Sequence, residues 1–293
     1  HSYNMGLLLR GYKEVQQNWL RLPIGYAGRS SSVVISGAKI PRPRGQAKLP
    51  DQNDSEYIAS KKLDFEMELG FFLGGKLNNQ GTPLTTAQVW DHIFGFVMLN
   101  DWSARDLQTW EYVPLGPLNS KNFNTTISPW IVTLDAFEEF RVKLPVQEPE
   151  PHLYLKDENM WGYDITMETL IKTSKSDKYE PLCKSNYKYL HWTIPQQVAH
   201  HTVSGCNLRP GDLVGSGACS GPEEGEYGTF VELSWNGKKP FKLSTGEERT
   251  FCEDGDSILL TGYSKSKNGY IIGFGECEGT ILPAVDLSIY EKK

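Results

Sequence analysis

Asp64-Phe65-Glu66-Met67-Glu68-Leu69 is the stretch that decides the fold, because its acidic and apolar residues alternate. Side chains of a β-strand point alternately to opposite faces, so the three acids are expected on one face and the three apolar residues on the other. A solvated strand face is the common explanation of such an acidic stripe. The apolar continuation over residues 70–75 instead favours a buried strand, where carboxylates need a cation or hydrogen bonds. The pattern therefore predicts a site for a hard cation.

A second stretch, Asn100-Asp101-Trp102-Ser103-Ala104-Arg105-Asp106-Leu107-Gln108, follows the apolar run 93–99. That run predicts a buried element that carries Asp101 at its end. The spacing of Asp101, Arg105 and Gln108 fits three polar groups on one face of a helical turn. A simple ion pair of Arg105 with Asp101 or with Asp106 is the alternative. Oxygen ligands suit Ca²⁺, Mg²⁺ or Mn²⁺ rather than Zn²⁺.

The composition narrows the class of protein. The chain has 293 residues, 39% hydrophobic residues and a net charge of -6, which is ordinary for a globular protein and weakly disfavours nucleic acid as a partner. No apolar run approaches the roughly 20 residues that span a bilayer. Five scattered cysteines without a C-x-x-C motif favour free thiols in a reducing compartment. We therefore expect a cytoplasmic protein that binds neither nucleic acid nor membrane.

Runs rich in β-branched and aromatic residues dominate the chain, and turn residues separate them. Strands are expected within residues 31–35, 131–134, 229–235, 257–261 and 270–274. Helices are expected at 85–93, capped by Thr85 or Thr86, and at 194–202. Residues 36–62 are interpreted as a long connection rich in Pro and Lys. This pattern predicts one mixed, β-dominated domain with short peripheral helices.

Other polar residues carry weaker signals. Glu232 lies in an otherwise apolar segment, so it is either an outward-facing residue or a buried carboxylate with a shifted pKa. The adjacent His200 and His201 point different ways on a helix and are interpreted as structural. The glycine-rich residues 215–222 lack the spacing of a dinucleotide site, and the chain has no G-x-S-x-G motif.

Five stretches resemble the eukaryotic fumarylacetoacetase (fumarylacetoacetate hydrolase) family: DFEMELGFF at 64–72, NDWSARDLQTWEYVPLGP at 100–117, HHTVSGCNLRPGDL at 200–213, VELSW at 231–235 and GYIIGFGECEGTILPA at 269–284. The resemblance implies the family's β-sandwich roll over residues 1–293, as a C-terminal catalytic domain without the small N-terminal β domain. It implies metal-dependent hydrolysis of a carbon–carbon bond in a β-diketone, 4-fumarylacetoacetate to fumarate and acetoacetate. That reaction is the last step of tyrosine and phenylalanine catabolism (EC 3.7.1.2), and the family implies a homodimer.

The resemblance also implies roles for individual residues. The residues that would hold Ca²⁺ or Mg²⁺, or line a neighbouring cation position, are Glu66, Glu68, Asp101, Lys121 and Thr125. Catalysis would use a general base with the residue that orients it, and groups near the scissile bond: His1, Glu232, Arg105, Gln108 and Lys121. Contacts with substrate would come from Arg10, Tyr26, Gln108, Tyr112 and the position of Ala218.

Two departures from the family pattern affect these expectations. The family has a further metal-binding Asp about seven residues before the His that matches His1, so we expect it upstream of this chain. The family often has Thr at the position of Ala218, where its hydroxyl contacts the substrate carboxylate. An acylpyruvate hydrolase, an oxaloacetate decarboxylase or a non-catalytic metal-binding relative therefore stay open as alternatives.

Overall fold

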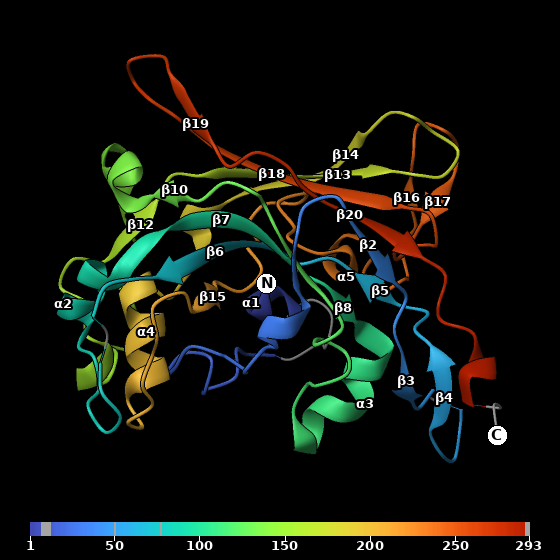
Figure 1. The fold of residues 1–293 in the computed structure, drawn as a ribbon, viewed down its shortest axis with the longest axis horizontal. Coiled ribbons are helices and arrows are strands. Elements are labelled where there is room, and N and C mark those ends of the chain that lie inside the picture. The colour runs from blue at the N-terminus through green and yellow to red at the C-terminus, as the bar shows by residue number, and fades with distance from the viewer. Residues whose placement is uncertain (7–12, 50, 77, 291–293) are drawn as a thin grey trace.

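The computed structural model describes residues 1–6, 13–49, 51–76 and 78–290, and two large sheets packed on each other form its core (Figure 1). The first sheet has the order β1 (Val33–Ile35), β9 (Thr125–Ile127), β7 (Ile93–Asp101), β6 (Met67–Leu73) and β15 (Leu213–Gly215), with β10 (Val132–Thr133) also paired to β7. The second has the order β14 (Glu180–Asn186), β13 (Thr166–Lys172), β18 (Ser257–Lys265), β20 (Cys277–Leu282) and β2 (Ala38–Pro41), with β19 (Ile271–Gly273) also paired to β18.

The alternating stretch that opens β6 positions the whole first sheet. Phe65, Met67 and Leu69 are fully buried in the core, and burying side chains of this size contributes roughly 1.5–3 kcal/mol each. Strands β6 and β7 are antiparallel, and the amide of Asp101 donates to the carbonyl of Glu66 at 3.2 Å. The two acids therefore lie side by side on neighbouring strands, and both are on the face of the sheet that is turned away from this core.

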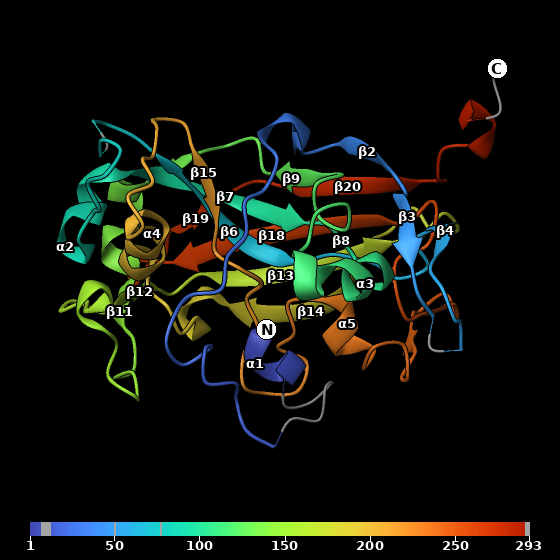
Figure 2. The same cartoon turned by 90° about the horizontal axis from the view of Figure 1, so that it is seen from below.

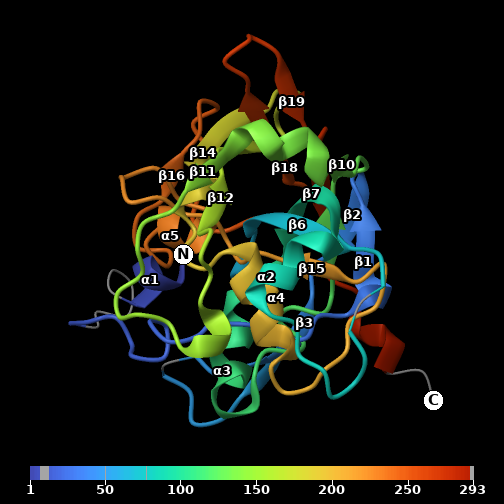
Figure 3. The ribbon, with the colours of Figure 1, turned by 90° about the vertical axis from the view of Figure 1, so that its left-hand side faces the viewer.

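Helices α2 (Thr86–Val89) and α4 (Ile194–Thr202) lie beside the first sheet (Figure 3). Both confirm predicted helices, and each begins with a capping box in which a Thr and the Gln three residues later satisfy each other's backbone N–H groups. The 3₁₀ turn η3 (Trp90–His92) continues α2 up to β7. The other helices and 3₁₀ turns are α1 (Ser2–Asn4), α3 (Arg105–Leu115), α5 (Phe230–Leu233), η2 (Ser30–Ser32), η4 (Leu134–Phe140), η5 (Leu153–Leu155), η6 (Tyr187–Tyr189) and η7 (Leu287–Tyr290).

Short two-stranded ribbons flank the two sheets (Figure 2). They are β3 (Arg44–Ala47) with β4 (Glu56–Ala59), β5 (Leu63–Asp64) with β8 (Ser103–Ala104), β11 (Arg141–Lys143) with β12 (Trp161–Tyr163), and β16 (Phe241–Lys242) with β17 (Glu248–Arg249). The predicted connection over residues 36–62 is therefore wrong, since it contains β2, β3 and β4. The mixed, β-dominated fold with few short helices is confirmed.

The strand predicted over residues 229–235 is also wrong, because this segment contains helix α5. The buried carboxylate of Asp64 accepts hydrogen bonds from the amides of Phe230 at 2.6 Å and Val231 at 3.1 Å. The Thr229 hydroxyl caps the same end by accepting from the amide of Glu232. These contacts from distant parts of the chain outweigh the local β-propensity. In the described part of the chain, no helix has the length and apolar character needed to cross a membrane.

Candidate active site

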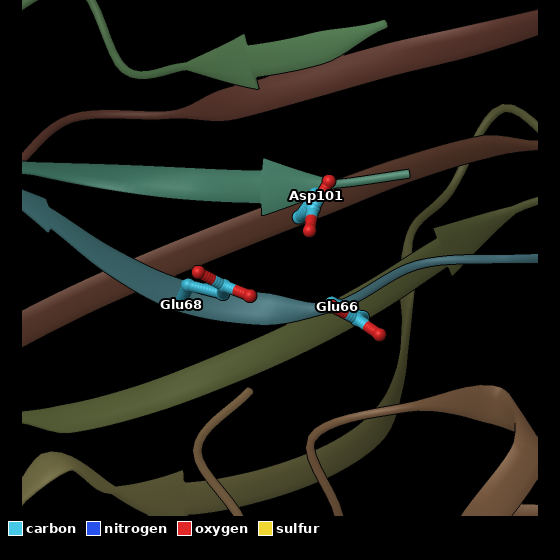
Figure 4. A group of neighbouring side chains, drawn as sticks. All are labelled: Glu66, Glu68 and Asp101. Carbon is cyan, nitrogen blue, oxygen red and sulfur yellow. The ribbon is translucent and has the colours of Figure 1, made fainter. Parts of the chain in front are cut away.

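Three carboxylates converge where β6 and β7 meet, on the side of the first sheet that faces away from the core (Figure 4). One oxygen each of Glu66, Glu68 and Asp101 lies within 4.8 Å of the other two. The three residues are only 7%, 3% and 8% exposed. The acidic stripe is therefore not a solvated strand face, and its acids need partners.

Two cationic side chains supply part of that compensation. The ammonium of Lys121 lies 2.7 Å from Oε2 of Glu66 and 2.9 Å from Oδ2 of Asp101. Arg105 bridges Glu66 and Asp64, with Nη1 at 2.8 Å from Glu66 Oε1 and Nε at 2.8 Å from Asp64 Oδ2. Burial alone would raise the pKa of Glu66, but the charges of Lys121 and Arg105 outweigh it and lower that pKa to about 2.

The charge balance of this cluster fits a divalent cation. Among the described residues, four carboxylates (Asp64, Glu66, Glu68 and Asp101) meet two cationic groups, which leaves two negative charges uncompensated. Burial and the charges of Asp101 and Glu66 accordingly raise the pKa of Glu68 well above its usual value. Burial raises the pKa of Asp101 as well. A bound cation would remove this repulsion, and an all-oxygen donor set suits a hard metal ion.

The groups around the trio come from separate parts of the chain. The amide of Gly217 donates to Glu68 Oε2 at 3.0 Å, and Ala218 follows it, buried. The hydroxyl of Tyr26 donates to Asp101, and burial together with the charge of Asp101 raises the pKa of that hydroxyl. Thr125 on β9 is the cross-strand neighbour of Asp101. The structure therefore brings Tyr26, Thr125 and the Ala218 loop to the trio.

The side chain of Lys121 reaches the trio as a positive charge. Its ammonium also donates to the Ser103 hydroxyl at 2.6 Å. The neighbouring charges of Asp101 and Glu66 outweigh the effect of burial and raise the pKa of Lys121. A protonated ammonium has three donors and no lone pair, so in this position Lys121 compensates the charge of the carboxylates that would hold a cation.

A second buried acid, Glu232 on α5, faces the N-terminal helix. Nδ1 of His1 lies 2.8 Å from Glu232 Oε2, and the Asn4 amide donates to Oε1 at 2.9 Å. The hydroxyls of Ser220 and Thr229 donate to Oε2 at 2.9 and 2.8 Å. Glu232 is 2% exposed, so it is a buried carboxylate and not an outward-facing residue. The contact between His1 and Glu232 that the resemblance implies is present.

Helix α3 carries the remaining predicted residues. Asp101 is the last residue of β7, so the predicted helical face shared by positions 101, 105 and 108 is wrong in its first member. Arg105 and Gln108 do share a face, and Arg105 Nη1 donates to Gln108 Oε1 at 3.2 Å. Tyr112 follows one turn later and is half-buried. Arg10 lies outside the described residues.

Several supporting residues escaped the sequence analysis. Asp64 was expected only as part of the acidic stripe, and its bonds to Arg105 and to the backbone of α5 were not. The other residues donate to Glu232 (Asn4, Ser220 and Thr229), accept from the Lys121 ammonium (Ser103) or donate to Glu68 (Gly217). Only Asn4 had a usable signal, since a residue three positions after His1 shares its face on a helix. The others depend on contacts between segments far apart in the chain.

A buried trio of acids on a two-sheet roll places this chain in a class of proteins whose carboxylate oxygens could hold a divalent cation. Comparison with known proteins identifies the family within this class. The family model described as "Fumarylacetoacetate (FAA) hydrolase C-terminal" matches residues 3–282. This chain belongs to the fumarylacetoacetate hydrolase family.

The relatives and the fold agree with this assignment. The chain is 50% identical over 289 residues to the fumarylacetoacetase of Dictyostelium discoideum and 52% identical over 286 residues to that of Arabidopsis thaliana. Each match covers 97% of this chain and 67% of the relative. The fold is similar to a crystal structure of fumarylpyruvate hydrolase from Pseudomonas aeruginosa in complex with Mn²⁺ and pyruvate, with a TM-score of 0.55, 18% identity, and coverage of 96% of this chain and 86% of that one.

Proposed function

We propose that this chain hydrolyses fumarylacetoacetate to fumarate and acetoacetate by cleaving a carbon–carbon bond. The observation that carries the proposal is the buried trio of Glu66, Glu68 and Asp101, joined to the helix of Glu232 through Arg105 and Asp64. This constellation lies in a chain that matches fumarylacetoacetases at about half of its positions. The acid trio, which is suited to a cation, and the His1–Glu232 pair, which is suited to proton transfer, are thus linked by hydrogen bonds and ion pairs.

The cation we propose is Ca²⁺ or Mg²⁺, held by Glu66, Glu68 and Asp101, with Thr125 at the edge of the site. The support is the all-carboxylate donor set and the two negative charges that Lys121 and Arg105 leave uncompensated. When bound, such a cation supplies Lewis-acid polarisation of the oxygens of a β-diketone.

His1 would act as the general base. Its Nδ1 is bonded to Glu232, which fixes the tautomer and leaves Nε2 free to accept a proton from a water molecule. The water oxygen then forms a bond to the carbonyl carbon, and the carbon–carbon bond breaks. The carbon that departs with the electron pair takes up the proton from His1, so the products are the two carboxylic acids and no other reactant is needed.

The cationic side chains of Arg105 and Lys121 and the amide of Gln108 would stabilise the negative charge that develops on the carbonyl oxygen of the substrate. Arg105 and Gln108 share one helix face, and Lys121 lies beside Glu66. We propose substrate contacts at Tyr26, Gln108 and Tyr112, at the backbone around Ala218, and at Arg10. Since Ala218 lacks the hydroxyl often found at this position, binding of one substrate carboxylate would be weaker by roughly 0.5–3 kcal/mol.

A comparison of substrates tests the proposal. Purified chain is assayed with fumarylacetoacetate, acetylpyruvate and oxaloacetate, each with Mg²⁺ or Ca²⁺ and with EDTA. We expect kcat/KM to be highest for fumarylacetoacetate and turnover to be lost in EDTA. A higher kcat/KM with acetylpyruvate or oxaloacetate would assign another reaction, and cation binding without turnover of any of the three would contradict an enzymatic role.

We also propose that residues 1–293 form one catalytic domain, that two copies form a homodimer, and that the protein is cytoplasmic. One core shared by both large sheets supports the first proposal. The exposed apolar side chains of Val113, Leu115 and Leu118 favour a surface that is covered in an assembly. The five cysteines are free, as expected in a reducing compartment. Light scattering on the purified chain tests the dimer.

A further inference from the structure

Glu111 on α3 has an unusual set of partners for a half-buried acid outside the metal trio. Its Oε1 accepts hydrogen bonds from the amides of Leu118 and Ser120, both at 2.8 Å, and its Oε2 accepts from the amide of Asn119 at 3.1 Å. The hydroxyl of Ser120 donates to it as well. Three successive amides that converge on one carboxylate form an anion-binding backbone turn, and hydrogen bonds to a charged acceptor are about twice as strong as neutral ones.

The turn that Glu111 holds leads directly into Lys121. The amides of Lys121 and Asn122 both donate to the carbonyl of Leu118, at 3.1 and 2.8 Å, so the turn closes on itself. The carbonyl of Ser120 accepts from the amide of Ala104 at 3.0 Å, which ties the same turn to the start of α3. The segment therefore runs back along α3 (Figure 2) and is bonded both to Ala104, which immediately precedes the helix, and to Glu111 within it.

Both elements that this clamp joins carry groups of the proposed site. Gln108 lies one turn before Glu111 on α3, and Arg105 one turn before that. Lys121 follows the clamped turn and reaches Glu66, Asp101 and Ser103 with its ammonium. A change in the turn would move that ammonium relative to Gln108, and a misplacement of about 1 Å in such a group can cost roughly a hundredfold in rate.

We infer that Glu111 is a positioning residue for Lys121: its carboxylate holds the 118–120 turn so that the ammonium is fixed against the acid trio. This inference rests on the proposed function for its effect on turnover. The clamp itself does not, because its loss is visible in the backbone amides whether or not the chain has activity.

The test uses the full chain with Glu111→Gln, which keeps the shape of the side chain but replaces an acceptor oxygen by a donor. Glu138→Gln is the matched control, since Glu138 forms a surface ion pair with Arg141. Hydrogen exchange measured by mass spectrometry should show faster exchange in a peptide covering residues 118–121 for Glu111→Gln and unchanged exchange for the control. Unchanged exchange of this peptide in Glu111→Gln would overturn the inference.

The second measurement asks whether Glu111 acts through Lys121. We expect Glu111→Gln to lower kcat for fumarylacetoacetate by about tenfold or more. In a Lys121→Met background, measured at enzyme concentrations high enough to follow a low rate, it should change kcat by less than roughly twofold. An equal loss in both backgrounds would show a merely structural effect and would overturn the inference.

Failure of the proposed function and failure of the inference about Glu111 can be distinguished. If the parent chain does not turn over fumarylacetoacetate, the proposed function fails while the exchange experiment still decides on the clamp. If Glu111→Gln does not fold, as judged by thermal denaturation, Ser120→Ala removes only the hydroxyl donor and is measured in the same way. For Ser120→Ala we expect a smaller rise in exchange at 118–121 than for Glu111→Gln, and a smaller loss of kcat that disappears in the Lys121→Met background. These results support the inference, and their absence overturns it.

Discussion

The acid trio and Glu232 are both buried carboxylate sites, and they are satisfied in opposite ways. Glu66 forms ion pairs with Lys121 and Arg105, and Asp101 forms one with Lys121. These two cations do not neutralise all the carboxylates of the cluster. Glu232 is held by an amide, two hydroxyls and the ring of His1. Charged partners allow several acids to gather at one point, as a cation site requires. Polar partners orient one carboxylate toward one imidazole, as proton transfer requires.

The largest effect is expected at the trio, where Glu66→Ala should abolish both cation binding and turnover. The substitution removes one proposed ligand and leaves Lys121 and Arg105 facing fewer acids, so several kcal/mol of transition-state stabilisation are lost, at least about 10³-fold in kcat/KM. Isothermal titration with Mg²⁺ and Ca²⁺ and a turnover assay measure both quantities. Unchanged affinity and rate would remove the trio from the site, and Glu138→Ala serves as the surface control.

Glu232→Gln separates the two carboxylate sites. It preserves the shape of the side chain but removes the charge that would stabilise a protonated His1, so we expect kcat to fall by about 10²- to 10³-fold. Cation affinity should stay within about twofold of the parent, because Glu232 is not one of the three carboxylates proposed as ligands. A large loss of cation affinity in this variant would show that the two sites are not distinct in function.

The pH dependence of cation binding is a third way to distinguish the sites. Burial and the charges of Asp101 and Glu66 raise the pKa of Glu68 in the cation-free protein, and its carboxyl must lose its proton to bind a metal ion. Affinity should therefore rise with pH, by up to about tenfold per unit for each proton released. Titration calorimetry in buffers of different ionisation enthalpy measures that release, and an affinity independent of pH between 5 and 8 would contradict it.

The stability of the cation-free protein should change with pH in the opposite direction. A raised pKa in the folded state means that the folded chain binds more protons than the unfolded chain above the ordinary pKa of a glutamate. Stability in EDTA should then fall as pH rises from about 5 toward the raised pKa of Glu68. Thermal denaturation with and without Mg²⁺ checks this, and the stabilisation by Mg²⁺ should grow with pH.

The smallest effect is expected from Ser220→Ala, which removes one of the hydroxyl donors to Glu232. Thr229 and Asn4 still donate to the carboxylate, so the loss is about 1 kcal/mol, or roughly fivefold in kcat. Cation affinity should not change. Steady-state kinetics with fumarylacetoacetate checks the value, and a loss as large as that of Glu232→Gln would show that the donors do not act separately.

The trio could be predicted from sequence because it depends on one strand pair. The alternation over residues 64–69 and the apolar run before Asp101 set which side chains face the core, and antiparallel pairing then places Glu66 beside Asp101. Helix α4 was equally accessible, since its capping residues and Pro195 are local in the chain.

The surroundings of Glu232 could not be predicted in this way. Residues 229–235 have β-branched and aromatic character, and the start of helix α5 depends on the carboxylate of Asp64, more than 160 positions away, in addition to the local cap at Thr229. Within 36–62, strand β2 depends likewise on a distant partner, β20 near the other end of the chain, whereas β3 and β4 pair with each other. Local propensity is a weak guide wherever a tertiary contact supplies the hydrogen bonds.

Asp64 connects the acid trio with the helix that carries Glu232. The same carboxyl group is bonded to the backbone of α5 and to Arg105, and Arg105 in turn is bonded to Glu66. A continuous chain of hydrogen bonds and ion pairs thus joins the backbone of α5 to the guanidinium and the guanidinium to Glu66. Anyone who wishes to widen the substrate range by shifting Glu232 would therefore shift the arginine beside the proposed metal site as well.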